Sequence, residues 1–285
     1  MSQTTLRQAY EAAYGRPHSK KAQEEDSRAF DLSCLFQRAF GISRYQLPLV
    51  GEQLADLEKL SLFQNLCARY EAGEPLQYIL GEWEFFGLSF YVGPGVLIPR
   101  PDTEILVEKA LELLAGTQTP RIADLCAGTG CVGISLAAHR PQAQVYALEL
   151  SPLAFSYLER NIQRNQVSVT PLLGDALIPL ELPPLDLVVS NPPYISKEEM
   201  EQLDPLVKQE PELALYGGED GYRFYQRLPS LYFPLLKPGG AMAFEVGYRQ
   251  ANHVKAFMEA AGFQRVGIQK DLAGIDRVVF GSKPE

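Results

Sequence analysis

The chain has 285 residues, of which 46% are hydrophobic and 21% are charged, and its formal net charge is −9. This composition favours one large and one smaller packed domain and argues against a disordered chain. The acidic balance also argues against a protein whose whole surface grips nucleic-acid phosphates.

Residues 1–75 are predicted to form a small helical domain. One predicted helix carries an apolar face, ended by Gly41, that comprises Leu32, Phe36, Ala39 and Phe40. The next carries apolar residues near a 3.6-residue period, namely Leu54, Leu57, Phe63, Leu66 and Tyr70. Short helices need one another's apolar faces to be stable, so we expect a bundle.

Residues 76–98 are predicted to be a β-hairpin linker between two domains. The segment "QYILGEWEFFGLSFYVGPGVLI" is rich in aromatic and β-branched residues and is interrupted by Gly81, Gly87 and Gly93. Asp102 is then expected to cap a helix.

Residues 99–285 are predicted to form an α/β domain. From residue 121 strands alternate with helices; the predicted strands begin with "RIADLC", "AQVYALE", "VTPLL" and "LDLVVS" and continue with "AMAFEV". This alternation predicts a mostly parallel, doubly wound sheet. The last two strands, "QRVGIQ" and "DRVVFG", are joined by a short loop and are expected to form an antiparallel edge pair.

The cysteines and histidines give no sign of a metal site. The four cysteines form no CxxC pair, and the three histidines lie far apart in the sequence. The start "MSQTTLRQAY" lacks the apolar core of a signal peptide, and no apolar run is long enough to cross a bilayer. We therefore expect a reduced, cytoplasmic protein that binds no metal and no membrane.

A glycine loop follows the first strand of the predicted sheet. In "ADLCAGTGCVG", Gly128, Gly130 and Gly133 match the G-x-G-x-x-G pattern, in which glycine lets the backbone approach a ligand. Glu149 ends the second strand and could accept hydrogen bonds from a ribose, which NAD and S-adenosylmethionine both carry. Asp124 favours S-adenosylmethionine, because a carboxylate there suits its cationic methionine end and would repel a pyrophosphate.

Two further features follow the third and fourth strands. Asp175 could meet the amino group of an adenine. The segment "SNPPYIS" places Asn191 and Pro192 beside Pro193 and Tyr194 at the end of the fourth strand, which this architecture puts next to the first.

The chemistry of that tetrad suits a planar NH2 group. Asn191 offers a side-chain carbonyl, Pro192 a free backbone carbonyl and Tyr194 a flat face, while Pro193 stiffens the turn. Two acceptors would fix the plane of an amide or amino nitrogen, aim it at a methyl group, and stabilise the charge that develops on it. Taken alone, the tetrad could be a simple turn, but its pairing with an upstream glycine loop favours a site.

With these motifs, the chain resembles the protein-(glutamine-N5) methyltransferase family, most closely the enzymes that methylate peptide-chain release factors. The resemblance spans nearly the whole chain and rests on the glycine loop, "SNPPYI" and three further segments: "PLQYILG", "PGVLIPRPDTE" and "EPELALYGGEDGYRFY". It implies a helical N-terminal domain that docks the protein substrate, a linking β-hairpin and a seven-stranded Rossmann-like methyltransferase domain.

The resemblance also implies site residues. The S-adenosylmethionine site that it implies comprises Cys126, Ala127, Gly128, Thr129, Gly130, Glu149, Asp175, Ala176 and Asn191, to which the charge argument above adds Asp124. Asn191 and Pro192 are expected to hold the substrate amide against Tyr194, with Phe85 and Arg100 as walls of the glutamine pocket. The sequence departs from the family pattern at Cys126, where glycine is usual, at Glu149, where aspartate is usual, and at Ala176, where an aromatic is frequent.

The expected activity is transfer of a methyl group to the side-chain nitrogen of the glutamine in the Gly-Gly-Gln loop of release factors. We expect a monomer that forms no stable complex with nucleic acid. Alternatives are N5-methylation of a ribosomal protein, adenine-N6 methylation of a flipped base, an NAD-dependent oxidoreductase, and a scaffold without turnover. The acidic run "EEMEQLDP" argues against the nucleic-acid enzyme, which should carry a basic recognition region.

Overall fold

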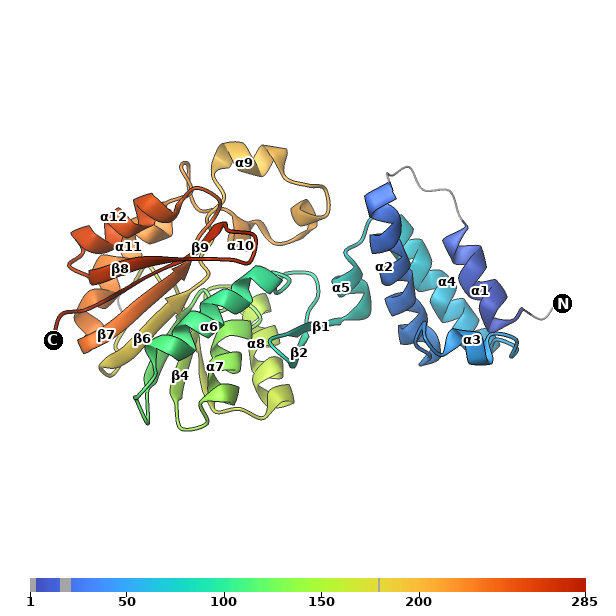
Figure 1. The fold of residues 1–285 in the computed structure, drawn as a ribbon, viewed down its shortest axis with the longest axis horizontal. Coiled ribbons are helices and arrows are strands. Elements are labelled where there is room, and N and C mark those ends of the chain that lie inside the picture. Colours follow the sequence, from blue (N-terminus) through green and yellow to red (C-terminus); the bar gives the residue numbers. More distant parts are fainter. Residues whose placement is uncertain (1–3, 16–21, 179) are drawn as a thin grey trace. The chain divides into compact units, whose positions relative to one another are not determined.

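The computed structural model describes residues 4–15, 22–178 and 180–285, and it divides into two compact units, Met1–Gly81 and Glu82–Glu285. Figure 1 shows the elements of each unit. The parts of the predicted N-terminal domain at residues 1–3 and 16–21 lie outside the described residues. In the described chain, no helix combines the length and apolar character needed to cross a membrane.

The first unit is helical, as predicted. Its helices are α1 (Leu6–Tyr14), α2 (Ala22–Phe40), α3 (Leu47–Val50), α4 (Leu57–Glu71) and α5 (Leu76–Leu80). Phe36 is fully buried, and its ring lies 5.4 Å from that of Tyr10 and 5.3 Å from that of Phe63, both in edge-on geometry. The unit therefore has an aromatic core shared by α1, α2 and α4.

The predicted apolar faces are correct for α2 and only partly correct for α4. The four residues predicted for the α2 face are all buried. Leu54 and Leu57, however, are 55% and 77% exposed. The reason is that Asp56 caps α4 by accepting hydrogen bonds from the backbone of Glu58 and Lys59, so Leu54 precedes the helix and Leu57 is its first residue.

The predicted hairpin is shorter than expected. Residues 77–80 belong to α5, which ends at Gly81 in a left-handed conformation with φ of 77°. The hairpin comprises β1 (Glu82–Phe85) and β2 (Leu88–Tyr91), and residues 92–98 form no strand. The prediction that the whole segment 77–98 is a hairpin is therefore wrong at both ends.

The second unit contains a seven-stranded sheet, as the resemblance implied. Its strands are β3 (Arg121–Leu125), β4 (Gln144–Glu149), β5 (Val169–Leu173), β6 (Leu185–Ser190), β7 (Leu236–Glu245), β8 (Gln264–Lys270) and β9 (Asp276–Ser282). Their order is β5-β4-β3-β6-β7-β9-β8, parallel from β5 to β7 and antiparallel from β7 to β8. The doubly wound sheet and the antiparallel edge pair are thus confirmed.

Helices cover both faces of this sheet (Figure 1). One core includes α6 (Glu104–Leu113), α7 (Cys131–His139) and α8 (Pro152–Asn165), and the other includes α11 (Arg223–Tyr232) and α12 (Ala251–Ala260). Consecutive residues of a strand serve opposite faces, since Ile122 lies in the first core and Ala123 in the second. The remaining short elements are η1 (Pro101–Thr103), α9 (Lys197–Gln202), η2 (Val207–Gln209), α10 (Glu212–Leu215) and η3 (Phe233–Leu235).

Three local predictions need correction. The capping residue of α6 is Thr103, without a side-chain hydrogen bond, because Asp102 lies in η1 and pairs with Arg277 instead. The "KPGG" segment, predicted as a turn, lies within β7, where the pairing with β6 shifts register between Leu236 and Ala241. The predicted helix 222–236 ends as an α-helix at Tyr232, with Pro229 inside it.

Strand order brings two loops together. Leu125, the last residue of β3, pairs with Ser190, the last residue of β6, and the Ser190 hydroxyl donates to the Leu125 carbonyl at 2.7 Å. The glycine loop after β3 and the tetrad after β6 therefore begin side by side at the carboxyl edge of the sheet, where open parallel sheets bind ligands.

Candidate functional site

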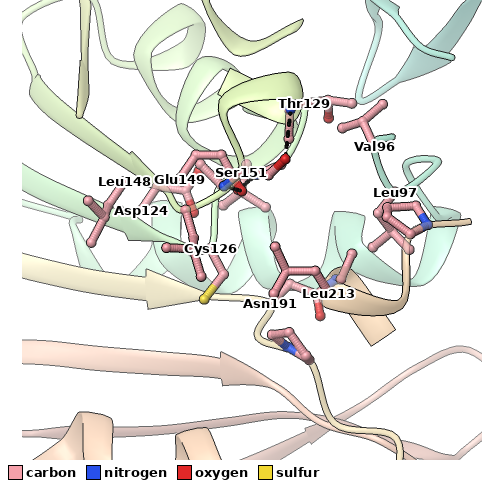
Figure 2. A pocket seen from close by; sticks show the side chains of 18 of the residues that line it. Val96, Leu97, Asp124, Cys126, Thr129, Leu148, Glu149, Ser151, Asn191 and Leu213 are labelled. Carbon is pink, nitrogen blue, oxygen red and sulfur yellow. Dashed lines mark hydrogen bonds between the residues drawn. The ribbon is translucent and has the colours of Figure 1, made fainter. Parts of the chain in front are cut away.

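A cavity of about 980 Å³, part of it open to solvent, lies at this edge within the second unit. Figure 2 shows Glu149 and Ser151 on one side of it and Asn191 and Leu213 on another. Eleven of the predicted site residues line it: Arg100, Asp124, Cys126, Ala127, Gly128, Thr129, Glu149, Asp175, Ala176, Asn191 and Pro193. Expected cofactor residues and two expected substrate residues besides Asn191, namely Arg100 and Pro193, therefore share one cavity.

The glycine loop leaves room for a ligand on one side and packs tightly on the other. Gly128 lines the cavity with φ of 56°, and a Cβ atom there would find only Val96 Cγ2, at 4.0 Å. At Gly130, where φ is 81°, a Cβ would lie 2.4 Å from Leu158 Cδ1. Both positions thus favour glycine, the first by keeping a cradle open and the second by letting the loop rest on α8.

Glu149 is held by the backbone around it. Its Oε2 accepts from the Gly128 N–H at 2.8 Å and its Oε1 from the Ser151 N–H at 2.7 Å. Burial raises the pKa of this carboxyl, and the backbone hydrogen bonds oppose that rise. Since each carboxylate oxygen has two acceptor sites, both can still accept from a ligand hydroxyl.

Asp124 is almost fully buried behind the loop. Its Oδ2 accepts from the Gly133 N–H at 2.8 Å, and a Cβ at Gly133 would lie 2.9 Å from the same oxygen. Burial raises the pKa of Asp124 to about 7, and the nearby Glu149 contributes to the rise. The third glycine of the motif is therefore needed to admit this carboxylate beside the first turn of α7.

Only part of the tetrad lines the cavity. Asn191 and Pro193 line the cavity, whereas Pro192 and Tyr194 do not. Asn191 Nδ2 donates to Thr103 Oγ1 at 3.2 Å, which leaves the side-chain oxygen Oδ1 as the free acceptor. In the described chain no hydrogen bond uses the Pro192 carbonyl, while the Tyr194 carbonyl accepts from Gln250 Nε2 at 2.9 Å.

The Tyr194 ring packs against the protein and does not line the cavity. A Cβ at Gly247 would lie 2.8 Å from its ring, and burial raises the pKa of its hydroxyl to about 12, with Glu245 as the next cause. The ring therefore packs against Gly247 and stabilises the tetrad on the side away from the cavity.

An ion pair connects two walls of the cavity. Glu210 is 5% exposed, accepts from the Ile98 N–H at 3.0 Å and pairs with Arg100. The segment before η1 is thereby tied to the segment that leads into α10, whose Leu213 faces the cavity. Arg100 lines the cavity, and its charge is already paired with Glu210.

Phe85 does not reach the cavity. It is 2% exposed and packs on Phe90 in the core, with the ring centroids 6.1 Å apart. The expectation that Phe85 walls a glutamine pocket is therefore corrected, because its place in β1 turns it into the interior. Gly130 also lies outside the lining.

Three residues at this edge were not predicted for the site. Thr103 touches Asn191, Glu210 fixes Arg100, and Glu245 ends β7 next to β6. A signal existed for Glu245, since it closes a predicted parallel strand beside the tetrad, and for Glu210, which lies within the "EPELALYGGEDGYRFY" segment.

Two family models match the chain. Residues 101–219 match the Methyltransferase small domain, and residues 19–81 match the PrmC N-terminal domain. The first match covers β3 to β6 and the tetrad, so the second unit contains a methyltransferase domain.

Solved structures agree with this fold. The chain is similar to a methyltransferase from Pyrococcus furiosus, with a TM-score of 0.53 and 19% identity over 78% of this chain and 100% of that one. It is also similar to the hMettl16 catalytic domain, solved with the MAT2A 3'UTR hairpin 6, with a TM-score of 0.59 and 15% identity over 82% and 86% of the two chains. At these identities the likeness concerns the fold alone.

Curated relatives are much closer in sequence. The release factor glutamine methyltransferase of Geobacter sulfurreducens is 41% identical over 87% of each chain. That of Aquifex aeolicus is 35% identical over 93% of this chain and 94% of its own. The chain therefore belongs to the release factor glutamine methyltransferase family.

Proposed function

We propose that this protein transfers a methyl group from S-adenosylmethionine to the side-chain amide nitrogen of the glutamine in the Gly-Gly-Gln loop of peptide-chain release factors. The observation that carries the proposal is that Glu149 and Asn191 line one cavity, so a ribose acceptor and an amide acceptor face the same space. The names of the relatives support the choice of substrate. Because release factors act on ribosomes, we place the activity in the cytoplasm.

The residues around the glycine loop fit S-adenosylmethionine. The open cradle at Gly128 gives space for a ligand, and the Glu149 carboxylate can accept from ribose hydroxyls beside it. Asp175 and Ala176 would lie at the adenine, and Asp124 at the cationic methionine end. When bound, S-adenosylmethionine supplies an electrophilic methyl group, which replaces one hydrogen of the glutamine nitrogen while a proton passes to water.

The tetrad would hold the substrate amide. Asn191 Oδ1 and the Pro192 carbonyl oxygen would each accept one hydrogen of the glutamine NH2 group. An amide nitrogen is a weak nucleophile because its lone pair is delocalised, so fixing its plane and direction is the main contribution the protein can make. The same two oxygens would stabilise the positive charge that develops on the nitrogen in the transition state.

The rigidity of the tetrad supports this role. Pro192 and Pro193 restrict the backbone, and the hydrogen bond from Gln250 holds the carbonyl of Tyr194. The Asn191 acceptor, which already lines the cavity, needs no reorganisation during the reaction.

The test is methyl transfer with mapping. The purified protein is incubated with S-adenosylmethionine and a purified release factor, and the methylated residue is located by peptide mass spectrometry. We expect one added methyl on the loop glutamine, and none when that glutamine is replaced by alanine. A methyl on another residue, or on a ribosomal protein or adenine offered in parallel while the release factor stays unmodified, would overturn the proposal.

A further inference from the structure

Two buried polar side chains adjoin Asn191: Thr103, which also lines the cavity, and Glu245. Asn191 Nδ2 donates to Thr103 Oγ1 at 3.2 Å, and Thr103 is 2% exposed. Burial raises the pKa of Glu245, also 2% exposed, to about 7, while hydrogen bonding to the neighbouring side chains of Thr103 and Asn191 opposes that rise. Glu245 does not line the cavity.

The sheet places these groups together. Ser190 pairs with Phe244 on the parallel strands β6 and β7, so Asn191 and Glu245 each lie one residue beyond that pair. Thr103 approaches from η1, whose Asp102 is held to β9 by Arg277 at 3.0 Å. Two segments, η1 and the end of β7, therefore converge on the side-chain amide of Asn191.

We propose that Thr103 and Glu245 are positioning residues that fix the direction of the Asn191 amide, so that its oxygen rather than its NH2 group faces the cavity. This inference rests on the proposed function, because only an amide-binding site needs an oxygen there. A flipped Asn191 would present donors to the hydrogens of a glutamine NH2 group.

The direction follows from what each group can donate. Above a pH of about 7, the pKa of Glu245, this carboxylate is ionised and only accepts, so the Thr103 hydroxyl donates its single hydrogen to Glu245. The Thr103 oxygen is then available only as an acceptor, and the Asn191 group that faces it must be the NH2. Oδ1 is left for the cavity.

The surroundings of Glu245 stabilise this direction. Its Oε2 is buried without a hydrogen-bond partner in the described chain, so turning the Thr103 hydroxyl away would leave yet another acceptor unsatisfied. Burial and, to a lesser degree, the charge of Asp102 raise the pKa of Glu245, whereas the charge of Arg277 lowers this pKa and favours the ionised carboxylate. The Glu245 carboxylate at the end of β7 thus sets the donor-to-acceptor direction of the hydrogen bonds that run from Asn191 through Thr103 to Glu245.

Three variants separate positioning from simple packing. Thr103→Val removes the hydroxyl at nearly constant volume, Thr103→Ser keeps the hydroxyl, and Glu245→Gln removes the charge. For Thr103→Val we expect kcat to fall about 10- to 100-fold, the size typical of lost supporting hydrogen bonds around a site. KM for the release factor and Kd for S-adenosylmethionine should change by less than about threefold. Thr103→Ser should recover most of the turnover, and Glu245→Gln should lower kcat without weakening cofactor binding.

A second measurement does not depend on turnover. In protein labelled with ¹⁵N-asparagine, the side-chain NH2 of Asn191, assigned by its loss in Asn191→Asp, should show a nuclear Overhauser contact to the Thr103 methyl group. That contact should weaken in Glu245→Gln.

The outcomes are distinct. A kcat of Thr103→Val within about twofold of wild type, or a loss that Thr103→Ser does not recover, would overturn the inference. So would an Asn191 NH2 without contact to Thr103. If the wild-type protein methylates no release factor, the proposed function fails, and the NMR contact alone then decides whether Thr103 and Glu245 orient Asn191.

Discussion

Glu149→Gln is the substitution that tests the cofactor site most directly. The wild-type carboxylate accepts from two backbone N–H groups, of Gly128 at 2.8 Å and Ser151 at 2.7 Å, one on each oxygen. A glutamine keeps one acceptor and places an NH2 group where the other stood. That NH2 group would face a backbone donor and could not accept from a ribose hydroxyl.

The expected effect is one lost hydrogen bond to a charged acceptor. Such a bond contributes about 1.5–3 kcal/mol, so the Kd for S-adenosylmethionine should rise about 10- to 150-fold. Isothermal titration calorimetry measures it, and thermal unfolding checks the fold. The control is Glu159→Gln, an exposed carboxylate on α8, which should leave the Kd unchanged. Glu149→Asp keeps both oxygens on a shorter arm and should bind between the two.

A Kd for Glu149→Gln within about threefold of the wild-type value, in a protein that unfolds at the same temperature, would refute the assignment of Glu149 to the ribose.

Three further expectations follow. Asn191→Ala should lower kcat at least about 100-fold with an unchanged Kd for S-adenosylmethionine; near-normal turnover would remove Asn191 from the mechanism. Asn161 is fully buried and hydrogen-bonds Tyr91 and the Thr129 carbonyl, so Asn161→Leu should cost about 3 kcal/mol or more in urea unfolding, and a loss below about 1 kcal/mol would contradict this. Burial raises the pKa of Asp124 to about 7, so the native state binds a proton at Asp124 more tightly than the unfolded state does. The free energy of unfolding of the wild type, relative to that of Asp124→Asn, should therefore fall as the pH rises from about 4 to 7. Plots of this free energy against pH that run parallel for the two proteins would contradict the prediction.

The strand order of the sheet could be predicted from the sequence because the alternation of strands and helices is clear. Strands separated by helices leave few topologies, and in a doubly wound sheet the fourth strand lies beside the first. Pairing of β3 with β6 confirms that inference. The adjacency of glycine loop and tetrad could therefore be predicted without any contact information.

Errors occurred where local preference and structure disagree. Residues 77–80 have side chains that suit a strand, yet they form a single turn of helix between Pro75 and Gly81. A helix of five residues is too short to show a period. The exposed Leu54 and Leu57 matched the period of the following helix, but the Asp56 cap shifts its start beyond Leu54.

The details of the site could not be predicted because they join distant segments. The Asn191–Thr103 hydrogen bond spans 88 residues, and the Arg100–Glu210 pair spans 110. Both depend on how loops fold over the edge of the sheet. Phe85 was assigned by resemblance alone, and its burial in the core depends on the packing of the hairpin, which the sequence does not reveal.

The most direct test is a structure of the ternary complex with a release factor and a non-reactive analogue of S-adenosylmethionine. We expect the nitrogen of the loop glutamine within about 3.2 Å of both Asn191 Oδ1 and the Pro192 carbonyl oxygen. A glutamine carboxamide held by other groups, with these two oxygens turned away, would contradict the proposed role of the tetrad.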